Sequence, residues 1–428
     1  MNIGVIGGGI TGLTAAYRLS KAGHKVTVFE KERFLGGLAS AIDFSGAKLD
    51  RIYRHIFKSD LHFVKLVEEL GLSDKFTWIE SKMGWFDGKK LYPFTTPLHV
   101  LQFSPLSFID RLKLGLMTVY LARVNKWKKY ENITAKDWVI KYVGQKVYDT
   151  VWGALLKQKF GARTDEIAMT WLYGRIHARI ASRVSKELLG YMNGSFQVLI
   201  DTLEQEIRKN GGKISCGTAV NRVLAENGRV TGVATGGTEQ KFDAVIATPA
   251  PQLLRKMADF PVEYDARFDR LDYYASVVLV MSMKKQITPY YWVNMAADDS
   301  PIVALIEHTN FIDKSAYAGN HIAYLGKYLP QQDALYKKTD SEIKDIFFTY
   351  LMKAFPEFDE KNVLEWKVTR EPFSQPIVPL KFSEIKLDYV TPVKGLYSAN
   401  MSQIYPEDRG MNFAVMQGNE VSDLIIKS

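Results

Sequence analysis

The sequence predicts an α/β fold in which a Rossmann-like, dinucleotide-binding domain is built from discontinuous segments. A substrate domain with a mixed sheet and a helical insertion completes the predicted fold. Near the N-terminus, a glycine-rich turn stands between an apolar strand and a helix, which is the arrangement of a dinucleotide-binding unit. Further short strands follow near residues 213–247 and 395–400. The 428 residues also exceed what one ordinary core accommodates, so several lobes are expected.

The N-terminal segment carries the strongest local signal. Residues 2–6 form a short apolar run with β-branched side chains, which is typical of a buried parallel strand. The turn that follows reads Gly-Gly-Gly-Ile-Thr-Gly over residues 7–12 and matches G-x-G-x-x-G. Residues 13–22 show helical spacing, and residues 25–29 form a second apolar strand that ends at Glu30. Strand, turn, helix and acid therefore occur in the order of a dinucleotide-binding motif.

Each glycine of the motif has a physical role. Gly7 permits the tight turn out of the strand, Gly9 leaves room for a pyrophosphate, and Gly12 lets helix and strand pack closely. The N-terminus of the helix offers free N–H groups and partial positive charge to phosphates. Glu30 stands where a carboxylate can bind ribose hydroxyls.

Three sequence-distant blocks are expected to complete one sheet. Short strands are predicted at 213–220, 231–235 and 242–247, a further strand at 395–400, and a closing helix at 411–426. The segment near 60–195 is expected to be mostly helical, whereas the segment near 265–385 contains apolar or alternating runs and one amphipathic helix at 340–354. The predicted division is dinucleotide-binding domain 1–58, 196–262 and 389–428, helical insertion 59–195, and strand-rich substrate domain 263–388.

Composition excludes several classes of function. The net charge is +9, but the Lys and Arg residues are scattered apart from residues 123–129, so no nucleic-acid partner is expected. A single cysteine, Cys216, excludes an internal disulfide and a cysteine-based metal cluster. His, Asp and Glu show no metal-ligand spacing. No secretory signal is expected from residues 1–7, and no apolar stretch is long enough to span a membrane. A cytoplasmic location is expected.

The motif and its continuation resemble a known family. Glu30 is followed by a Gly-Gly pair, and the chain also contains the strand Ala244–Pro249, Trp366 with Pro372, and Gly395-Leu396-Tyr397 before the closing helix. These features resemble the flavin-containing amine oxidase and protoporphyrinogen oxidase-like family, which has the glutathione-reductase-type fold. The resemblance implies FAD as cofactor. The family usually has Gly-Asp after the last strand, whereas this chain has Ala399-Asn400.

The resemblance also implies which residues contact FAD. They belong to the glycine motif, the segment after the second strand, the loop near the flavin and the last two blocks. They are Gly7, Gly9, Ile10, Thr11, Gly12, Glu30, Lys31, Gly36, Gly37, Leu38, Tyr53, Val220, Asn400, Met411 and Asn412.

His55 and Arg54 are the candidate catalytic residues, because the resemblance places residues 53–55 near the flavin ring. Imidazole titrates near neutrality, so His55 is a candidate general acid or base. Arg54 is a candidate partner for an anionic substrate group or for the charge of the reduced flavin. A purely structural role, in which both side chains fix the loop, stays open.

Three other groups of side chains each allow two interpretations. Arg175, His177 and Arg179 suit a diphosphate or carboxylate site, but a solvated helix face is favoured. The aromatic side chains of residues 85–94 suit an apolar pocket, but ordinary core is favoured. Apolar residues 112–121, followed by Lys126-Trp127-Lys128-Lys129-Tyr130, suit either peripheral contact with a membrane or a buried helix with a basic end.

The sequence therefore predicts an FAD-dependent oxidoreductase. Its expected substrate is a bulky small molecule that is apolar or lipid- or sugar-linked, and hydride passes from it to the flavin. The alternative is a redox-neutral flavoenzyme that acts on a nucleotide sugar, similar to UDP-galactopyranose mutase. Residues 409–412 match the C-terminal pattern of that enzyme only in part. A third class is a non-catalytic, FAD-dependent scaffold with a closed flavin face.

Overall fold

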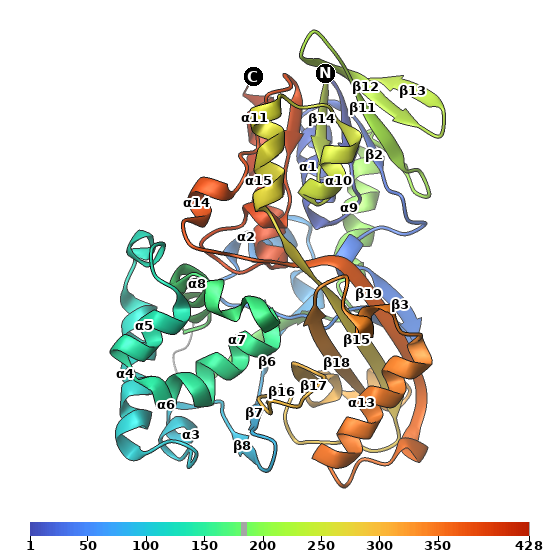
Figure 1. Cartoon of the computed structure of the whole chain (residues 1–428). Helices are drawn as coiled ribbons and strands as arrows, with labels where there is room; N and C mark the ends of the chain where they lie inside the picture. Colours follow the sequence, from blue (N-terminus) through green and yellow to red (C-terminus); the bar gives the residue numbers. More distant parts are fainter. Residues whose placement is uncertain (181–185, 428) are drawn as a thin grey trace.

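A computed structural model describes residues 1–180 and 186–427. The chain forms an upper part that holds both termini, and a lower part with helices on one side and a twisted sheet on the other (Figure 1). Within the described residues, no helix is long and apolar enough to cross a membrane.

A five-stranded parallel sheet forms the centre of the upper part. Its order is β10 (Lys213–Ser215), β2 (Lys25–Phe29), β1 (Asn2–Ile6), β14 (Ala244–Ala247) and β20 (Leu396–Ser398). β1 and β14 are buried along nearly their whole length, because their small and β-branched side chains are covered on both faces. Segments from the start, middle and end of the chain thus share one sheet, and their carboxyl ends meet at one edge.

Helices pack closely on this sheet. They are α1 (Ile10–Lys21) and α9 (Gln197–Lys209), with α15 (Met411–Ile426) packed on α1 and α2 (Leu61–Glu69) packed on α15. A Cβ added to Gly418 in α15 would lie 2.6 Å from the Cβ of Thr14 in α1. The C-terminal helix therefore packs against the first helix at a distance that only a glycine permits.

A small antiparallel sheet extends from the upper part. It contains β11 (Val220–Glu226), β12 (Arg229–Thr235) and β13 (Thr238–Lys241), and the short helices α10 (Pro251–Met257) and α11 (Val262–Asp265) follow β14. The single strand expected at 213–220 is wrong, since β10 ends at Ser215 and β11 begins at Val220. Gly217, with φ of +66°, forms the turn between them, and its N–H donates to the Glu32 carbonyl at 2.7 Å.

A seven-stranded mixed sheet forms one side of the lower part. Its order is β19 (Val363–Pro376), β15 (Tyr273–Met283), β18 (His321–Leu329), β17 (Ala304–Glu307), β16 (Trp292–Met295), β7 (Met83–Phe86) and β8 (Leu91–Pro93). Every residue of β15 is buried. The amphipathic helix α13 (Asp340–Ala354) buries Ile343, Phe347 and Leu351 in the same cluster as the apolar side chains of this sheet.

Helices form the other side of the lower part (Figure 1). They are α3 (Pro97–Leu101), α4 (Phe108–Arg123), α5 (Ala135–Tyr142), α6 (Gln145–Val147), α7 (Gly153–Phe160) and α8 (Met169–Ile180). The segment 59–195 is less helical than expected. It also contributes β7 and β8 to the large sheet, and β6 (Phe76–Glu80) and β9 (Leu188–Met192) to a small sheet with β5 (Ile56–Phe57). β7 pairs with its neighbour β8 and also with the distant β16, and local periodicity does not report the second pairing.

Candidate functional site

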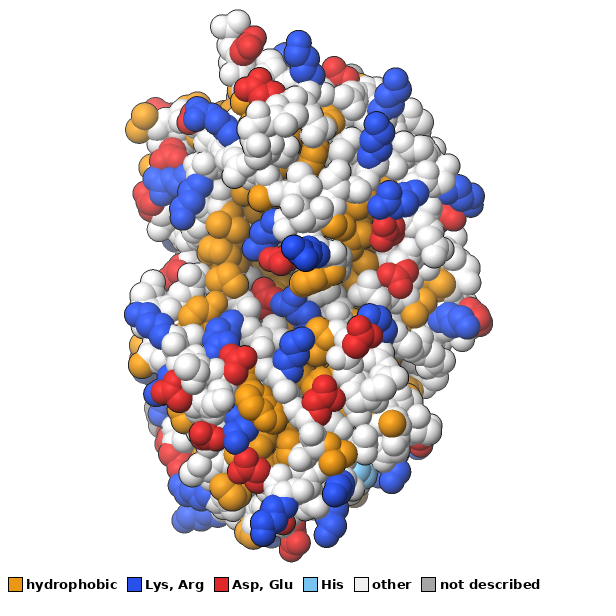
Figure 2. Space-filling model, turned by 90° about the vertical axis from the view of Figure 1, so that its right-hand side faces the viewer, with side chains coloured by type: hydrophobic (Ala, Val, Ile, Leu, Met, Phe, Trp, Pro, Cys, Tyr) orange, Lys and Arg blue, Asp and Glu red, His pale blue; other side chains and the backbone are white. Residues whose placement is uncertain are grey.

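One cavity of about 930 Å³ lies where the upper and lower parts meet. Its wall combines the glycine motif, the loop 51–57, helices α7 and α8, strands of the seven-stranded sheet and the segment 400–414. The volume lies in the range of cofactor and ligand sites. Figure 2 shows a hollow across the middle of one face, where hydrophobic side chains gather beside Lys and Arg side chains.

The glycine motif forms a cradle at the upper end of the cavity. A Cβ added to Gly9 would have no atom within 4 Å, whereas one added to Gly12 would lie 2.0 Å from the Gly7 carbonyl oxygen. Gly9 therefore faces open space, and Gly12 allows the helix to pack on the turn. α1 begins at Ile10 with no side-chain cap, so its free N–H groups and partial positive charge suit a pyrophosphate in this space.

Glu30 is fixed at the carboxyl end of β2. Its carboxylate is buried and accepts hydrogen bonds from the N–H of Gly8 at 2.7 Å and of Glu32 at 2.9 Å. A carboxylate has about four lone-pair sites, so acceptor capacity is left for a ribose hydroxyl. Glu30 also lines the cavity.

The second glycine pair continues this cradle. Gly36 has φ of +103°, and its N–H donates to the Gly8 carbonyl at 2.8 Å. The chain after β2 therefore runs back across the motif. Several other predicted FAD contacts lie on the same cavity wall, namely Ile10, Thr11, Lys31, Gly37, Leu38 and Val220. The open space at Gly9, the fixed carboxylate and the helix N-terminus fit an extended dinucleotide.

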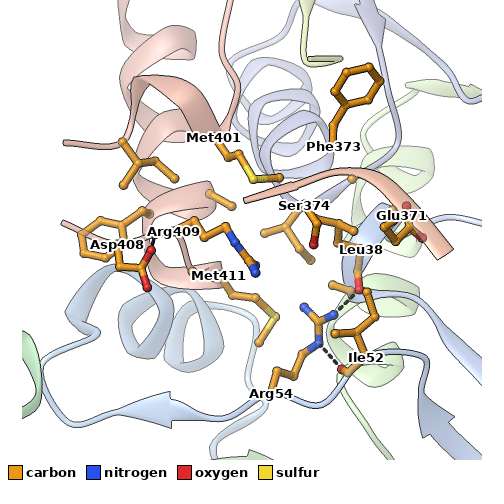
Figure 3. A pocket seen from close by; sticks show the side chains of 18 of the residues that line it. Leu38, Ile52, Arg54, Glu371, Phe373, Ser374, Met401, Asp408, Arg409 and Met411 are labelled. Carbon is orange, nitrogen blue, oxygen red and sulfur yellow. Dashed lines mark hydrogen bonds between the residues drawn. The ribbon is translucent and has the colours of Figure 1, made fainter. Parts of the chain in front are cut away.

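Arg54 and Arg409 meet in the centre of the cavity, where their guanidinium groups point toward the same open space (Figure 3). Arg54 donates to the carbonyl oxygens of Leu38 and Ile52. Burial lowers the pKa of Arg54, and the carboxylate of Asp50 opposes that shift. Arg54 thus holds the loop in place with part of its donor set and presents its charge to the cavity.

His55 also lines the cavity but differs from its expected chemistry. Its Nδ1 lies 3.1 Å from the Tyr291 hydroxyl, and its ring makes edge contacts with Phe57 and Trp292. Burial, reinforced by the charge of Arg179, lowers the pKa of His55 to about 3. The expectation that this imidazole titrates near neutrality is therefore wrong, because the aromatic surroundings disfavour the cation. His55 is a neutral acceptor or donor at pH 7.

The other predicted FAD contacts divide into two groups. Tyr53, Asn400 and Met411 line the cavity. Asn412 is absent from its lining, because its buried Oδ1 accepts the N–H groups of His62 and Phe63 at the start of α2. The amide of Asn400 is also engaged within the protein, since its Oδ1 accepts from the Ser402 N–H and hydroxyl.

A charged cluster borders the same cavity and contains Arg175, which the sequence analysis named, together with Lys159 and Asp408, which it did not. The Asp408 carboxylate accepts from Lys159 and Arg175, each at 2.9 Å, and from the indole N–H of Trp171 at 3.1 Å. Burial lowers the pKa of Lys159 to about 7, and the cations Arg175 and Arg409 act in the same direction. Burial alone would raise the pKa of Asp408, but the surrounding cations hold it well below its usual range. The signal in the sequence was the spacing of Arg175 and Arg179 on one helix face.

The remaining sequence candidates lie in different places. Arg179 lines the cavity and pairs with Glu187 at 2.6 Å, whereas His177 stacks on Tyr173. Trp85 packs with Phe94 and Phe103 in the core of the helical side, so the core reading holds for it. Among the described residues, no group of three His, Cys, Asp or Glu side chains is arranged to hold a metal ion.

Comparison with known proteins finds one family whose profile spans almost the whole chain. A sequence profile of the flavin containing amine oxidoreductases matches residues 10–426. The 15-cis-phytoene desaturase of Arabidopsis thaliana is 22% identical over 472 aligned positions, which cover 100% of this chain and 80% of that protein.

Solved structures share the fold. An oxidoreductase from Methanosarcina mazei superimposes with a TM-score of 0.77 at 20% identity, covering 99% of this chain and 100% of that one. A reduced UDP-galactopyranose mutase superimposes with a TM-score of 0.78 at 16% identity, covering 100% and 95%. At these identities the likeness concerns the fold.

Proposed function

Because the chain belongs to the family of flavin-containing amine oxidoreductases, it is an FAD-dependent oxidoreductase, and we propose that it takes hydride from a bulky, apolar or lipid- or sugar-linked substrate. The observation that carries this proposal is the continuous cavity. It runs from the glycine cradle to a chamber between α7, α8 and the seven-stranded sheet. FAD, when bound, supplies the hydride acceptor, and the protein supplies binding, orientation and electrostatics.

The walls of the chamber support a bulky substrate with an apolar part. Trp152, Leu155 and Leu156 line it from the helical side, and Trp292 and Val303 line it from the large sheet. Such surfaces gain free energy by covering apolar groups and exclude water from the reacting atoms. A non-catalytic scaffold would require a closed flavin face, whereas the chamber beside the cradle is open.

Within the chamber, we assign distinct tasks to Arg54 and His55. The Arg54 cation is placed to offset negative charge that develops nearby. The Tyr291 hydroxyl orients neutral His55 through Nδ1, which leaves Nε2 to form a hydrogen bond with substrate or water.

The variant His55→Gln tests that assignment. It should keep FAD content unchanged and lower turnover about tenfold, the scale of one lost hydrogen bond to the substrate. FAD content is measured by absorbance after denaturation. Equal loss of FAD and turnover would support the structural reading of His55.

The proposed reaction class is tested without knowing the substrate. FAD-loaded protein is mixed, in the absence of oxygen, with separated lipid and aqueous fractions of a cell extract. We expect a lipid or amphiphile fraction to bleach the visible band of oxidised flavin, because hydride transfer reduces it. If no fraction bleaches the flavin and UDP-galactose raises the melting temperature of the reduced protein, the redox-neutral mutase reading replaces this proposal. The cationic cluster around Asp408 is the observation that favours that alternative.

We also propose that the outer face of α4 contacts a membrane surface. Exposed apolar side chains gather on α3, α4 and the end of α5, namely Leu98, Leu101, Phe108, Ile109, Leu112, Leu116, Val119, Tyr120 and Tyr142. Exposed basic residues surround them, namely Lys113, Arg123, Lys126, Lys128, Lys129 and Lys141. A second cavity of about 600 Å³ opens among Leu116, Tyr120 and Tyr142. Apolar contact with a basic rim matches an anionic lipid surface.

A further inference from the structure

Two cationic side chains and one backbone N–H meet at one carboxylate on the wall of the main cavity. Lys159 from α7 and Arg175 from α8 both donate to Asp408, and the backbone N–H of Arg409 donates to its Oδ1 at 3.1 Å. The Arg409 side chain turns from this point into the cavity (Figure 3). All of these side chains line the cavity.

Aromatic rings and neutral groups hold the cations in position. Lys159 Nζ lies 4.7 Å from the ring centroid of Trp171. The Arg409 guanidinium donates to the Tyr328 hydroxyl at 2.7 Å and to Gln375 Oε1 at 3.1 Å. A guanidinium has five N–H donors, so these two bonds leave donors directed to the cavity. The hydroxyl and amide partners carry no charge, so they do not neutralise Arg409.

The charge of this cluster is not balanced among its own members. Lys159, Arg175 and Arg409 stand against the single carboxylate of Asp408, and Arg54, whose charge Asp50 opposes, lies across the cavity. Burying cations in excess of anions is costly. The lowered pKa of Lys159 reflects that cost, as burial and the neighbouring cations both disfavour its charge. A bound anion would remove the imbalance.

We propose that Lys159, Arg175 and Arg409 form a subsite that binds an anionic oxygen group, a carboxylate or a phosphate, of the substrate. This inference rests on the proposed function, because it names the head group of the substrate whose apolar body occupies the chamber. Asp408 is a positioning residue in this arrangement, since it bonds directly to the Lys159 and Arg175 cations and to the backbone N–H of Arg409. Arg409 supplies a forked donor set that matches the two oxygens of either anion.

Calorimetric titration of the FAD-loaded protein tests the subsite. Because FAD already occupies the cradle, binding of a probe anion is measured at the proposed subsite. The probes are inorganic pyrophosphate and dodecanoate, which separate a phosphate head group from a carboxylate with an apolar chain. We expect one of them to bind, and Arg409→Gln to weaken that binding about tenfold or more.

The matched control is Arg370→Gln. Arg370 also lines the cavity, but it pairs with Asp340 at 2.5 Å and donates to the backbone carbonyls of Tyr336 and Lys338. Binding should be unchanged in this variant. If Arg409→Gln fails to fold, Arg175→Gln serves instead, because Arg175 is partly exposed and its loss disturbs less of the interior.

The outcomes are distinguishable. Binding of a probe that is lost in the Arg409 or Arg175 variant and kept in the Arg370 variant supports the subsite. FAD-loaded protein that binds neither probe, or equal weakening in all variants, overturns it while leaving the redox proposal intact. Protein that binds no FAD overturns the proposed function itself.

Discussion

At the scale of single residues, Gly9 and Gly12 have opposite surroundings although they belong to one motif. The open space at Gly9 is where the motif would receive a pyrophosphate, and Gly12 touches the Gly7 carbonyl. Gly9→Ala should therefore leave the stability of the FAD-free protein unchanged and weaken FAD binding about tenfold or more, because a methyl group displaces a ligand atom. Fluorescence titration with FAD and thermal unfolding of the FAD-free protein measure the two effects.

Gly12→Ala is the comparison variant. Its Cβ would meet backbone at 2.0 Å, so it should lower both the melting temperature and FAD affinity. If Gly9→Ala binds FAD as tightly as the unmodified chain, the pyrophosphate does not lie at Gly9.

His308 gives a prediction about pH. Burial lowers its pKa from an ordinary 6.5 to about 3, and its Nε2 lies 2.8 Å from the Tyr317 hydroxyl. Between these pH values the unfolded chain binds a proton that the folded chain does not, so the free energy of unfolding falls as pH falls. The contribution is about 1.4 kcal/mol per pH unit.

Urea unfolding of the protein and of His308→Gln between pH 4.5 and pH 6.5 measures this contribution. Other titrating groups are the same in both proteins, so the difference between the two curves isolates His308. We expect the variant to lose stability less steeply, by about 1.4 kcal/mol per pH unit. Parallel curves would mean that the pKa of His308 is the same in the folded and unfolded chains, which contradicts the prediction.

The residues of the cavity differ in whether their roles could be predicted from the sequence. Glu30 and the motif glycines could be placed because their roles depend on neighbours within the same strand–turn–helix unit. Lys159 and Asp408 lie 249 residues apart and bond only after α7 packs against the segment before α15. The shifted titration of His55 was also out of reach, because it depends on the aromatic rings contributed by β16 and its flanks.

At the scale of elements, local periodicity succeeded where an element buries one face along its own length. α13 and α15 have the predicted bounds, 340–354 and 411–426. Strands whose partners lie far away in the sequence were harder to predict. Examples are β7, which pairs with β16, and β9, which pairs with β5 and β6. Pairing energy from distant segments overrides weak local propensity in such strands.

The exposed face of α4 gives a prediction at this scale. Phe108 and Leu116 are 64% and 71% exposed, so replacing both with Glu should not disturb the core. The double variant Phe108→Glu, Leu116→Glu should bind vesicles that contain phosphatidylglycerol about tenfold or more weakly, because two apolar contacts are lost and anions are added. Cosedimentation with vesicles measures the binding.

Val262→Glu is the control, because Val262 is 86% exposed but lies on α11, outside the α4 face. It should bind vesicles as the unmodified chain does. If the α4 variant and the control bind equally, or if size-exclusion shows that the α4 variant dissociates a dimer, the membrane assignment is wrong.

At the scale of the whole molecule, three distant segments form one sheet, and the elements between them form the lower part (Figure 1). This arrangement places the glycine cradle and the chamber on one cavity. Much of the discontinuous sheet could be predicted, since its strands end in recognisable turns, but the strand expected in it at 231–235 belongs instead to the small antiparallel sheet. The composition of the chamber could not, because its walls come from α7, α8, β16 and β18, which meet only in the folded chain.

The central claim is that this cavity binds FAD and uses it for net redox chemistry. Its most direct test is the absorbance spectrum of the purified protein before and after denaturation, with dithionite reduction and reoxidation in air. We expect flavin bands that denaturation releases as free FAD, full reduction by dithionite, and reoxidation by air or by an added acceptor. A colourless protein that also fails to bind added FAD would contradict the claim and leave the glycine cradle for another dinucleotide.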